Sequence, residues 1–303
     1  MRHIDTSVFI PPTNWAGKVI NAQSHYARTR VFTEIWKDLL TSLNALVRTE
    51  SNPPRKCWYS ELLILGSDGV DVDHFRPKSN VKELSPKFAN LEDSLWSQIY
   101  NIKRVGYDFL AFEWTNFRIA SQHSNQGRKE GIYTKGKQDF FPLSIKNITT
   151  ATDLLTLANE TICLLDPCDK DDPELLKFYA SGQVDASYPK DTWEYCRAKI
   201  SIEVYHLNFD LKGLTSVRLE HWQMITREIE QLNRLYLLRD FFNQQNSILP
   251  RHMNEGIEDQ GNKLIEFTRK SAQFSAVAID CIKHHRITYI WLNSLFTNEM
   301  LKK

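Results

Sequence analysis

The chain has 303 residues with a formal net charge of +1, and 42% of them are hydrophobic and 25% charged, as expected for one large globular domain or two modest ones. No apolar run approaches the ~18 residues of a membrane span, and the N-terminus lacks the apolar stretch of a secretory signal, so we expect a cytoplasmic protein without a membrane partner. The five cysteines are odd in number and scattered, which argues against a disulfide framework.

The first fifty residues are predicted to be helical after the proline pair at Pro11 and Pro12. Apolar residues recur at three- and four-residue steps from Phe32 to Leu46, as on one face of a helix. A second proline pair ends this segment in "SNPPRK" at 51–56, because paired prolines cannot continue a helix. We therefore assign residues 1–49 to an N-terminal helical segment.

The middle of the chain is predicted to hold two strands and a helix. Residues 69–75 alternate apolar and polar side chains, and "FEWTNFRIA" at 112–120 gives the second strand. A long loop with a short helical piece near 91–99 connects them. A helix is predicted to begin in "SNQGRKEG" with Ser124 as its N-cap. These elements form a core assigned to residues 50–145.

The remaining residues, 146–303, are predicted to be mainly helical. The stretch 150–167 has a helical pattern that ends at Pro167, and helical periodicity dominates from 191 to the end. This region carries no recognisable catalytic set, so we expect it to bind a partner. The fold class predicted for the whole chain is α+β, mostly helical, with a small strand–strand–helix core.

Asp73 and His74 at a predicted strand end are the candidate chemical centre, followed by Asn116 and, nine residues later, by Asn125. Phosphodiester hydrolysis needs a water deprotonated near neutral pH, and histidine titrates there. One amide can orient the imidazole, which suits Asn116. Oxygen ligands such as Asp73 and the Asn125 carbonyl suit Mg²⁺ or Mn²⁺. Asp71, on the same strand face, is a rival ligand.

Several segments in the same order resemble the HNH endonucleases, and more narrowly the HNH nucleases of Septu-type and retron-associated anti-phage systems. They cover roughly residues 30–215 and read "KCWYSE" (56–61), "VDHFRPKS" (72–79), "YDFLAFEWTNFRIASQHSNQGRK" (107–129), "FFPL" (140–143) and "LLDPCDKDDPELLKFYASGQV" (164–184). The resemblance implies a ββα-metal core with His74 as general base, Asp73 and Asn125 as ligands of one Mg²⁺ or Mn²⁺, and Asn116 as the residue orienting His74. It also implies a controlling ABC-type ATPase as partner and nucleic acid, DNA by preference, as substrate.

The chain departs from this family at its structural zinc. The family commonly has two C-x-x-C pairs, whereas the corresponding positions here are Cys57, Ser60, Ser121 and Ser124. One thiol cannot supply tetrahedral thiolate coordination, and a serine hydroxyl stays protonated. We therefore expect no structural zinc, and we expect apolar packing to hold the fold in its place.

Basic residues near the site are candidates for contact with phosphate. From Phe75 to Lys137 the chain has eleven Lys and Arg against six Asp and Glu, an excess that suits a polyanion or a solvated surface. Arg76, Lys78, Arg128 and Lys129 are the candidate nucleic-acid contacts, and ordinary ion pairs are the alternative. The alternative function is a catalytically degenerate HNH scaffold that binds the ATPase or nucleic acid without cleaving it.

Overall fold

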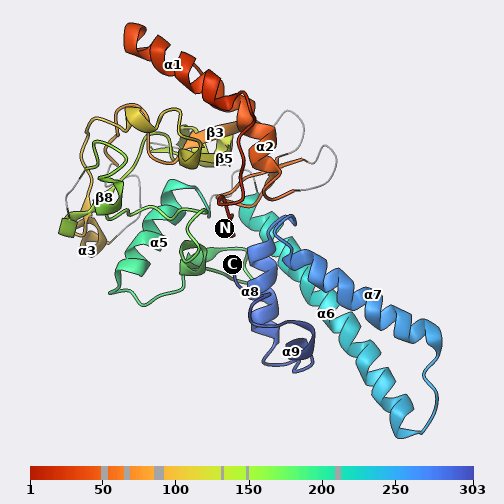
Figure 1. The fold of residues 1–303 in the computed structure, drawn as a ribbon. Helices are drawn as coiled ribbons and strands as arrows, with labels where there is room; N and C mark the ends of the chain where they lie inside the picture. The colour runs from red at the N-terminus through yellow and green to blue at the C-terminus, as the bar shows by residue number, and fades with distance from the viewer. Residues whose placement is uncertain (49–53, 65–68, 85–91, 131–132, 148–149, 209–212) are drawn as a thin grey trace. The chain divides into compact units, whose positions relative to one another are not determined.

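The computed structural model describes residues 1–48, 54–64, 69–84, 92–130, 133–147, 150–208 and 213–303 (Figure 1). The chain forms two compact units, one of residues 1–176 with 185–207 and the other of residues 177–184 with 208–303. We refer to them as unit 1 and unit 2. Helices and short two-stranded sheets together give a mixed α and β fold.

The N-terminal part of unit 1 begins with helix α1 (Trp15–Thr29), which ends at Arg30 in a left-handed conformation. The helix predicted around 32–46 is instead a 3₁₀ helix, η1 (Ile35–Leu39), followed by one turn of α-helix, α2 (Leu40–Asn44). A 3₁₀ turn stacks residues i and i+3 above one another. Trp36 and Leu39 are thereby both buried in the core.

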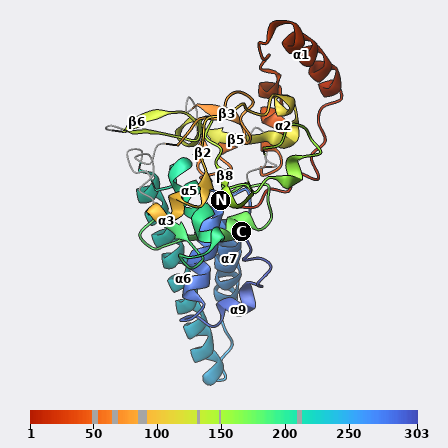
Figure 2. The same ribbon diagram turned by 90° about the vertical axis from the view of Figure 1, so that its left-hand side faces the viewer.

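The two predicted strands pair with each other. Strand β3 (Val70–His74) runs antiparallel to β5 (Phe117–Ser121), with Asp73 opposite Arg118 and His74 opposite Phe117. Figure 2 shows the two strands side by side. The second strand is shorter than predicted, because residues 114–116 form a 3₁₀ turn, η3 (Trp114–Asn116), before the extended segment begins.

The prediction of a helix with Ser124 as its N-cap is wrong. A four-residue helix, α4 (Gln122–Asn125), starts three residues earlier than predicted, with Ser121 as its N-cap accepting a hydrogen bond from the Ser124 backbone N–H. The chain then forms a hairpin of β6 (Arg128–Glu130) and β7 (Tyr133–Lys135). Antiparallel pairing of these two short strands takes the place of a continuing helix.

The rest of unit 1 consists of short elements and one longer helix. They are β1 (Arg55–Lys56), β2 (Leu63–Ile64), α3 (Asp93–Trp96), β4 (Ile99–Tyr100), η2 (Asp108–Leu110), β8 (Leu143–Ser144), η4 (Ile145–Asn147), η5 (Leu157–Asn159), η6 (Asp172–Leu175) and α5 (Trp193–Val204). Strand β1 pairs with β2, and β4 pairs with β8. The predicted short helix near 91–99 corresponds to α3, although Leu91 lies outside the described residues.

The helix predicted over 150–167 is reduced to the single turn η5. The Asp153 carboxylate accepts hydrogen bonds from the backbone N–H groups of Leu155 and Thr156. Such local side-chain bonds offer the backbone an alternative to helical bonding. Further on, the Leu165 N–H donates to Ser201 Oγ, so tertiary contacts satisfy this extended segment.

Unit 2 is built from helices, as the periodicity of residues 191–303 predicts. It contains α6 (Leu214–Gln244), α7 (Arg251–Thr268), α8 (Ser275–His285) and α9 (Leu292–Leu295), and α6 packs against both α7 and α8 (Figure 1). Ile225, Ile229 and Leu232 on α6 are fully buried. The chain passes between the units within strands β9 (Leu176–Phe178) and β10 (Val184–Ala186), and again between Leu207 and Asn208.

Among the helices that the structure describes, none combines the length and apolar character needed to cross a bilayer. The division of the chain at residues 49 and 145 stays a sequence-based prediction. The two compact units group residues 1–176 together, so the N-terminal segment and the strands of the candidate site share one core. That core includes Trp36, Leu43, Phe112 and Phe117.

Candidate functional site

The alternation of β3 sends Asp73 and His74 to opposite faces of the β3–β5 pair. Successive side chains of a strand point to opposite sides, and residues directly opposite on two strands share a side. His74 therefore lies on the same side as Phe117, where the N-terminal apolar core packs. Asp73 lies on the same side as Arg118, where the side chains are polar.

His74 is held in an apolar pocket. Its side chain is 6% exposed, and its ring centroid lies 4.6 Å from that of Trp36 and 5.0 Å from that of Phe117, both edge-on. Nε2 lies 2.9 Å from the carbonyl oxygen of Ala111. A carbonyl only accepts hydrogen bonds, so Nε2 carries the proton and Nδ1 keeps its lone pair.

The electrostatics of the pocket keep the imidazole neutral. Burial, together with the nearby positive charge of Lys78, lowers the pKa of His74 from 6.5 to about 3. A general base must be unprotonated before it acts, and His74 meets this condition at neutral pH.

Asn116 acts on the backbone that follows His74. Its Oδ1 accepts a hydrogen bond from the Arg76 N–H at 2.8 Å, and its Nδ2 donates to the Arg76 carbonyl at 2.9 Å. Its own carbonyl accepts from the Phe75 N–H at 2.8 Å. Asn116 thus fixes the chain after the strand end, whereas Ala111 holds the ring. Sequence reasoning missed Ala111 because a backbone carbonyl leaves no residue-specific signal.

Asp73 is engaged at both carboxylate oxygens. The hydroxyl of Tyr59 donates to Oδ2 at 2.6 Å, and the ammonium group of Lys137 donates to Oδ1 at 3.0 Å. Lys137 also donates to the His74 carbonyl at 2.8 Å, and its side chain is fully buried. The sequence pattern pointed to neither Tyr59 nor Lys137 as part of this site.

Asn125 is brought to Asp71, the rival ligand. Its Nδ2 donates to Asp71 Oδ2 at 3.0 Å, and Gln126 Nε2 donates to the same oxygen at 3.1 Å. The Oδ1 atom of Asn125 is buried and has no hydrogen-bond partner among the described residues. No hydrogen bond joins Asn125 to Asp73 in that part of the chain.

The arrangement around Asp73 does not fit a divalent metal ion. A Mg²⁺ ion bound directly to Asp73 at ~2.0–2.1 Å would have to share its oxygen with the hydrogen bond from Tyr59 or from the Lys137 ammonium. A dication about 4 Å from the Lys137 ammonium would be repelled by roughly 8 kcal/mol at an effective dielectric constant of about 20. Within the described residues, no group of three or more His, Cys, Asp or Glu side chains could hold an ion.

Three of the four positions at which the family resemblance places a zinc site bring their side chains together. Cys57 Sγ lies 3.7 Å from Ser124 Oγ, and Ser121 Oγ lies 3.3 Å from Ser124 Oγ. The Ser60 N–H donates to Cys57 Sγ at 3.5 Å. All four side chains are buried. A weak hydrogen-bonded cluster therefore stands where the family resemblance expects a metal.

Neighbouring backbone and aromatic contacts tie the hairpin of β1 and β2 to the rest of the site. The Trp58 N–H donates to the Ile119 carbonyl on β5 at 2.8 Å. Tyr59 stacks on Tyr205 with ring centroids 4.1 Å apart. Trp58 and Tyr59 are almost completely buried.

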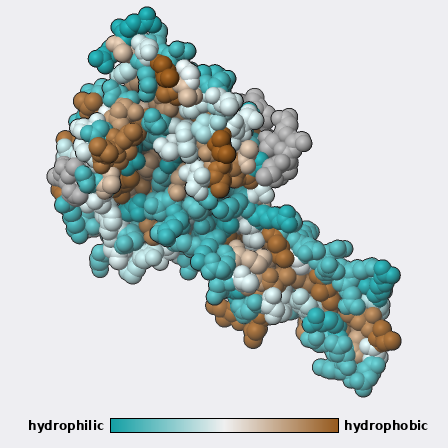
Figure 3. All heavy atoms as spheres, viewed as in Figure 1, coloured by the Kyte–Doolittle hydropathy of each residue, from teal (hydrophilic) through white to brown (hydrophobic). Residues whose placement is uncertain are grey.

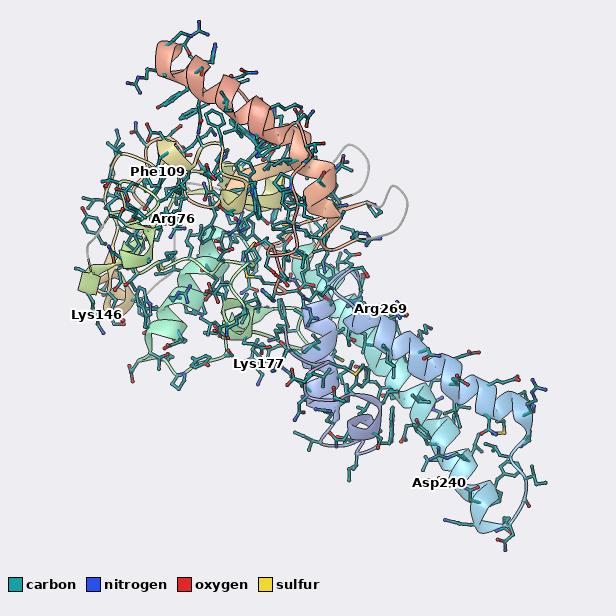
Figure 4. The ribbon with its side chains drawn as sticks, viewed as in Figure 1. Arg76, Phe109, Lys146, Lys177, Asp240 and Arg269 are labelled. Carbon is teal, nitrogen blue, oxygen red and sulfur yellow. The ribbon has the colours of Figure 1, made fainter. Side chains whose placement is uncertain are left out.

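The four candidate phosphate contacts differ in their surroundings. Arg76, labelled in Figure 4, is committed to an internal ion pair, with Nε 3.0 Å from Glu160 Oε2. Lys78 is half-buried, and its ammonium lies 4.6 Å from the Trp36 ring centroid, on the His74 side of the strands. Arg128 and Lys129 lie on β6, and their side chains are outside the described part of the structure.

No family model matches this chain. It is similar to the Septu protein PtuB of Bacillus mycoides (strain KBAB4), with 28% identity over 130 residues. The match covers 43% of this chain and 37% of the relative, so it spans less than half of either protein.

The serine substitutions predict that the purified protein holds no stoichiometric zinc, because one thiol cannot replace four. Four thiolates about 2.3 Å from zinc lie about 3.8 Å apart, close to the distance between Cys57 Sγ and Ser124 Oγ. The triple variant Ser60→Cys, Ser121→Cys, Ser124→Cys should therefore bind one zinc ion per chain, measured by elemental analysis. Zinc retained by the natural sequence after chelator dialysis would show that other ligands were overlooked.

The buried imidazole predicts an acid-sensitive fold. In the unfolded chain His74 binds a proton near pH 6.5, whereas the folded protein resists protonation down to about pH 3, so stability is lost as pH falls between these values. Between pH 7 and pH 5 this loss is about 2 kcal/mol. It should be absent in His74→Asn and unchanged in His252→Asn, whose histidine is exposed on α7. Urea unfolding at the two pH values measures it, and equal pH dependence in His74→Asn would contradict it.

Proposed function

We propose that this chain is the nuclease subunit of a Septu-type anti-phage defence system, hydrolysing DNA phosphodiester bonds on an HNH-like strand–strand–helix core. The observation that carries the proposal is the end of β3, where the neutral imidazole of His74 is fixed by a carbonyl and the following backbone is fixed by Asn116. The similarity to a Septu protein supports the defence role.

In this proposal His74 is the general base. With Nε2 donating to the Ala111 carbonyl, Nδ1 is the atom that accepts a proton from the attacking water. The low pKa of the free imidazole makes it a weak base, but an approaching phosphate anion raises that pKa, because it favours the protonated ring. The Lys78 ammonium, which lies over the Trp36 ring, supplies positive charge that stabilises the negative charge developing on the phosphate. In this proposal no Mg²⁺ or Mn²⁺ bound to Asp73 takes part, because each carboxylate oxygen already accepts a hydrogen bond and the Lys137 ammonium lies beside it.

The second candidate function is a non-cleaving scaffold, and the burial of the site favours it. The His74 ring and the Asp73 carboxylate are each only about one-twentieth exposed, and Lys137 is fully buried. A substrate phosphate needs direct contact with these groups or with a water between them. In a scaffold, the same residues serve only to hold β3 and β5 together.

Cleavage of DNA by the purified chain separates the two functions. Plasmid is incubated with the protein alone and with the partner ATPase that the family resemblance implies, in separate arms with chelator, Mg²⁺ and Mn²⁺. We expect cleavage to fall by about 10²–10⁴ in His74→Ala, the usual effect of removing a general base. His25→Ala, on the surface helix α1, is the matched control and should cleave normally. Equal cleavage by His74→Ala would remove His74 from catalysis, and no cleavage in any arm would favour the scaffold.

We also propose that unit 2 carries most of the surface for the ATPase. Leu237, Leu238 and Phe241, near the end of α6, are 61%, 46% and 57% exposed. Figure 3 shows brown apolar patches along this helical hairpin, and Figure 4 labels Asp240 between these positions. Clustered exposed apolar side chains mark interaction sites more often than solvated surface.

Charge placed on this surface should weaken the complex. Leu237→Asp with Phe241→Asp is expected to reduce co-purification with the ATPase and defence in cells, because the new carboxylates must lose water in an apolar interface. Leu155→Asp is the matched control, since Leu155 is 91% exposed in unit 1. Thermal unfolding of both variants checks that the fold is kept. An unchanged amount of co-purified ATPase would place the partner surface elsewhere.

A further inference from the structure

The polar face of β3 contains a buried cation supplied by the chain itself. Lys137 is fully buried, and its ammonium group donates to Asp73 Oδ1 at 3.0 Å and to the His74 carbonyl at 2.8 Å. A buried charge persists only when it is paired and hydrogen-bonded. Here the partners are one carboxylate and one backbone carbonyl, both at the strand end that bears the candidate base.

The backbone at Lys137 is also held by hydrogen bonds. Its N–H donates to the Ser124 carbonyl at 2.9 Å, and the next N–H, of Gln138, donates to the Asn125 carbonyl at 2.7 Å. Lys137 therefore bridges the end of α4 and the end of β3. These are the two elements that carry the expected metal ligands, Asn125 and Asp73.

Gly136 makes this bridge sterically feasible. Its φ of +109° is one that side-chain-bearing residues rarely adopt, and a Cβ at this position would lie 2.1 Å from the Gln126 carbonyl oxygen. The glycine lets the chain pass directly against the residue after α4. The lysine that follows then enters the site from that side.

We propose that the Lys137 ammonium is the resident cation of the Asp73 site and takes the place that the family resemblance gives to a divalent metal ion. As a positioning residue it neutralises Asp73 and fixes the carbonyl of His74, and Tyr59 completes the carboxylate's hydrogen bonding. The positioning role of Lys137 rests on the proposed function, because it concerns the same site. The metal-binding prediction, however, does not depend on cleavage.

Titration with Mn²⁺, followed by electron paramagnetic resonance of the free ion, tests the proposal in the full chain. The natural protein and Asp73→Asn should show the same binding, because the Lys137 ammonium beside Asp73 repels a dication. Lys137→Met removes the charge and leaves an unbranched side chain one atom shorter, so it should gain one Mn²⁺ site. Asp73→Asn added to Lys137→Met should weaken that site by more than about tenfold, as expected when a metal ligand is lost.

A double-mutant cycle in thermal stability gives a second readout that needs no metal. Lys137→Met alone leaves the Asp73 charge buried and unpaired, whereas the double variant with Asp73→Asn removes both charges. The double variant should therefore unfold at a higher temperature than Lys137→Met, and the two effects should not add. If Lys137→Met fails to fold, a folded double variant shows the same coupling.

Two results would overturn the proposal. One is Mn²⁺ binding by the natural protein that is lost in Asp73→Asn, because it would mean that Asp73 serves a metal while Lys137 is present. The other is additive stability effects in the cycle, because they would mean that the two charges are not paired. DNA cleavage is measured separately, so absence of cleavage would refute the proposed function and leave this cation assignment unaffected.

Discussion

The antiparallel pairing of β3 with β5 is the constraint on which the rest of the site depends. It sets Asp73 opposite Arg118 and His74 opposite Phe117, so two consecutive residues serve two unlike environments. One face meets the apolar side chains of the N-terminal helices, and the other meets a network of buried polar groups. A shift of register by one residue would exchange the two faces, leaving an unpaired carboxylate in the apolar core.

Hydrogen bonds and aromatic packing occupy the two places in unit 1 where the resemblance to the HNH nucleases predicts metal ions. At the predicted zinc position, the Cys57 thiol and the Ser121 and Ser124 hydroxyls form a hydrogen-bonded cluster, while the neighbouring Trp58 bonds to β5. At Asp73, an ammonium and a phenol satisfy the carboxylate. Such contacts are individually much weaker than zinc–thiolate coordination, so the fold needs many of them and the burial that makes each one effective.

Several of the basic side chains between Phe75 and Lys137 form ion pairs within unit 1. Arg118 forms a two-pronged ion pair with Asp166, at 2.7 and 2.6 Å, and Arg76 and Lys137 pair with Glu160 and Asp73. These three cations are bound to carboxylates supplied by other parts of unit 1. A nucleic-acid surface would have to be formed by the remaining basic residues, of which Lys78 lies beside His74.

The sequence by itself determined the local elements whose pattern is strong: the alternating strand that ends in Asp73 and His74, a second strand within residues 112–120, and the long helices of unit 2. These follow from periodicity, which depends only on neighbouring residues. It could not determine that residues 150–167 lack a helix, or that α4 stops after four residues, because side-chain hydrogen bonds and distant partners override local preference there. Only the tertiary structure decided what surrounds each candidate residue. Lys137 and Tyr59 reach Asp73 across 64 and 14 residues of chain, and Ala111 reaches His74 through a carbonyl that every residue possesses.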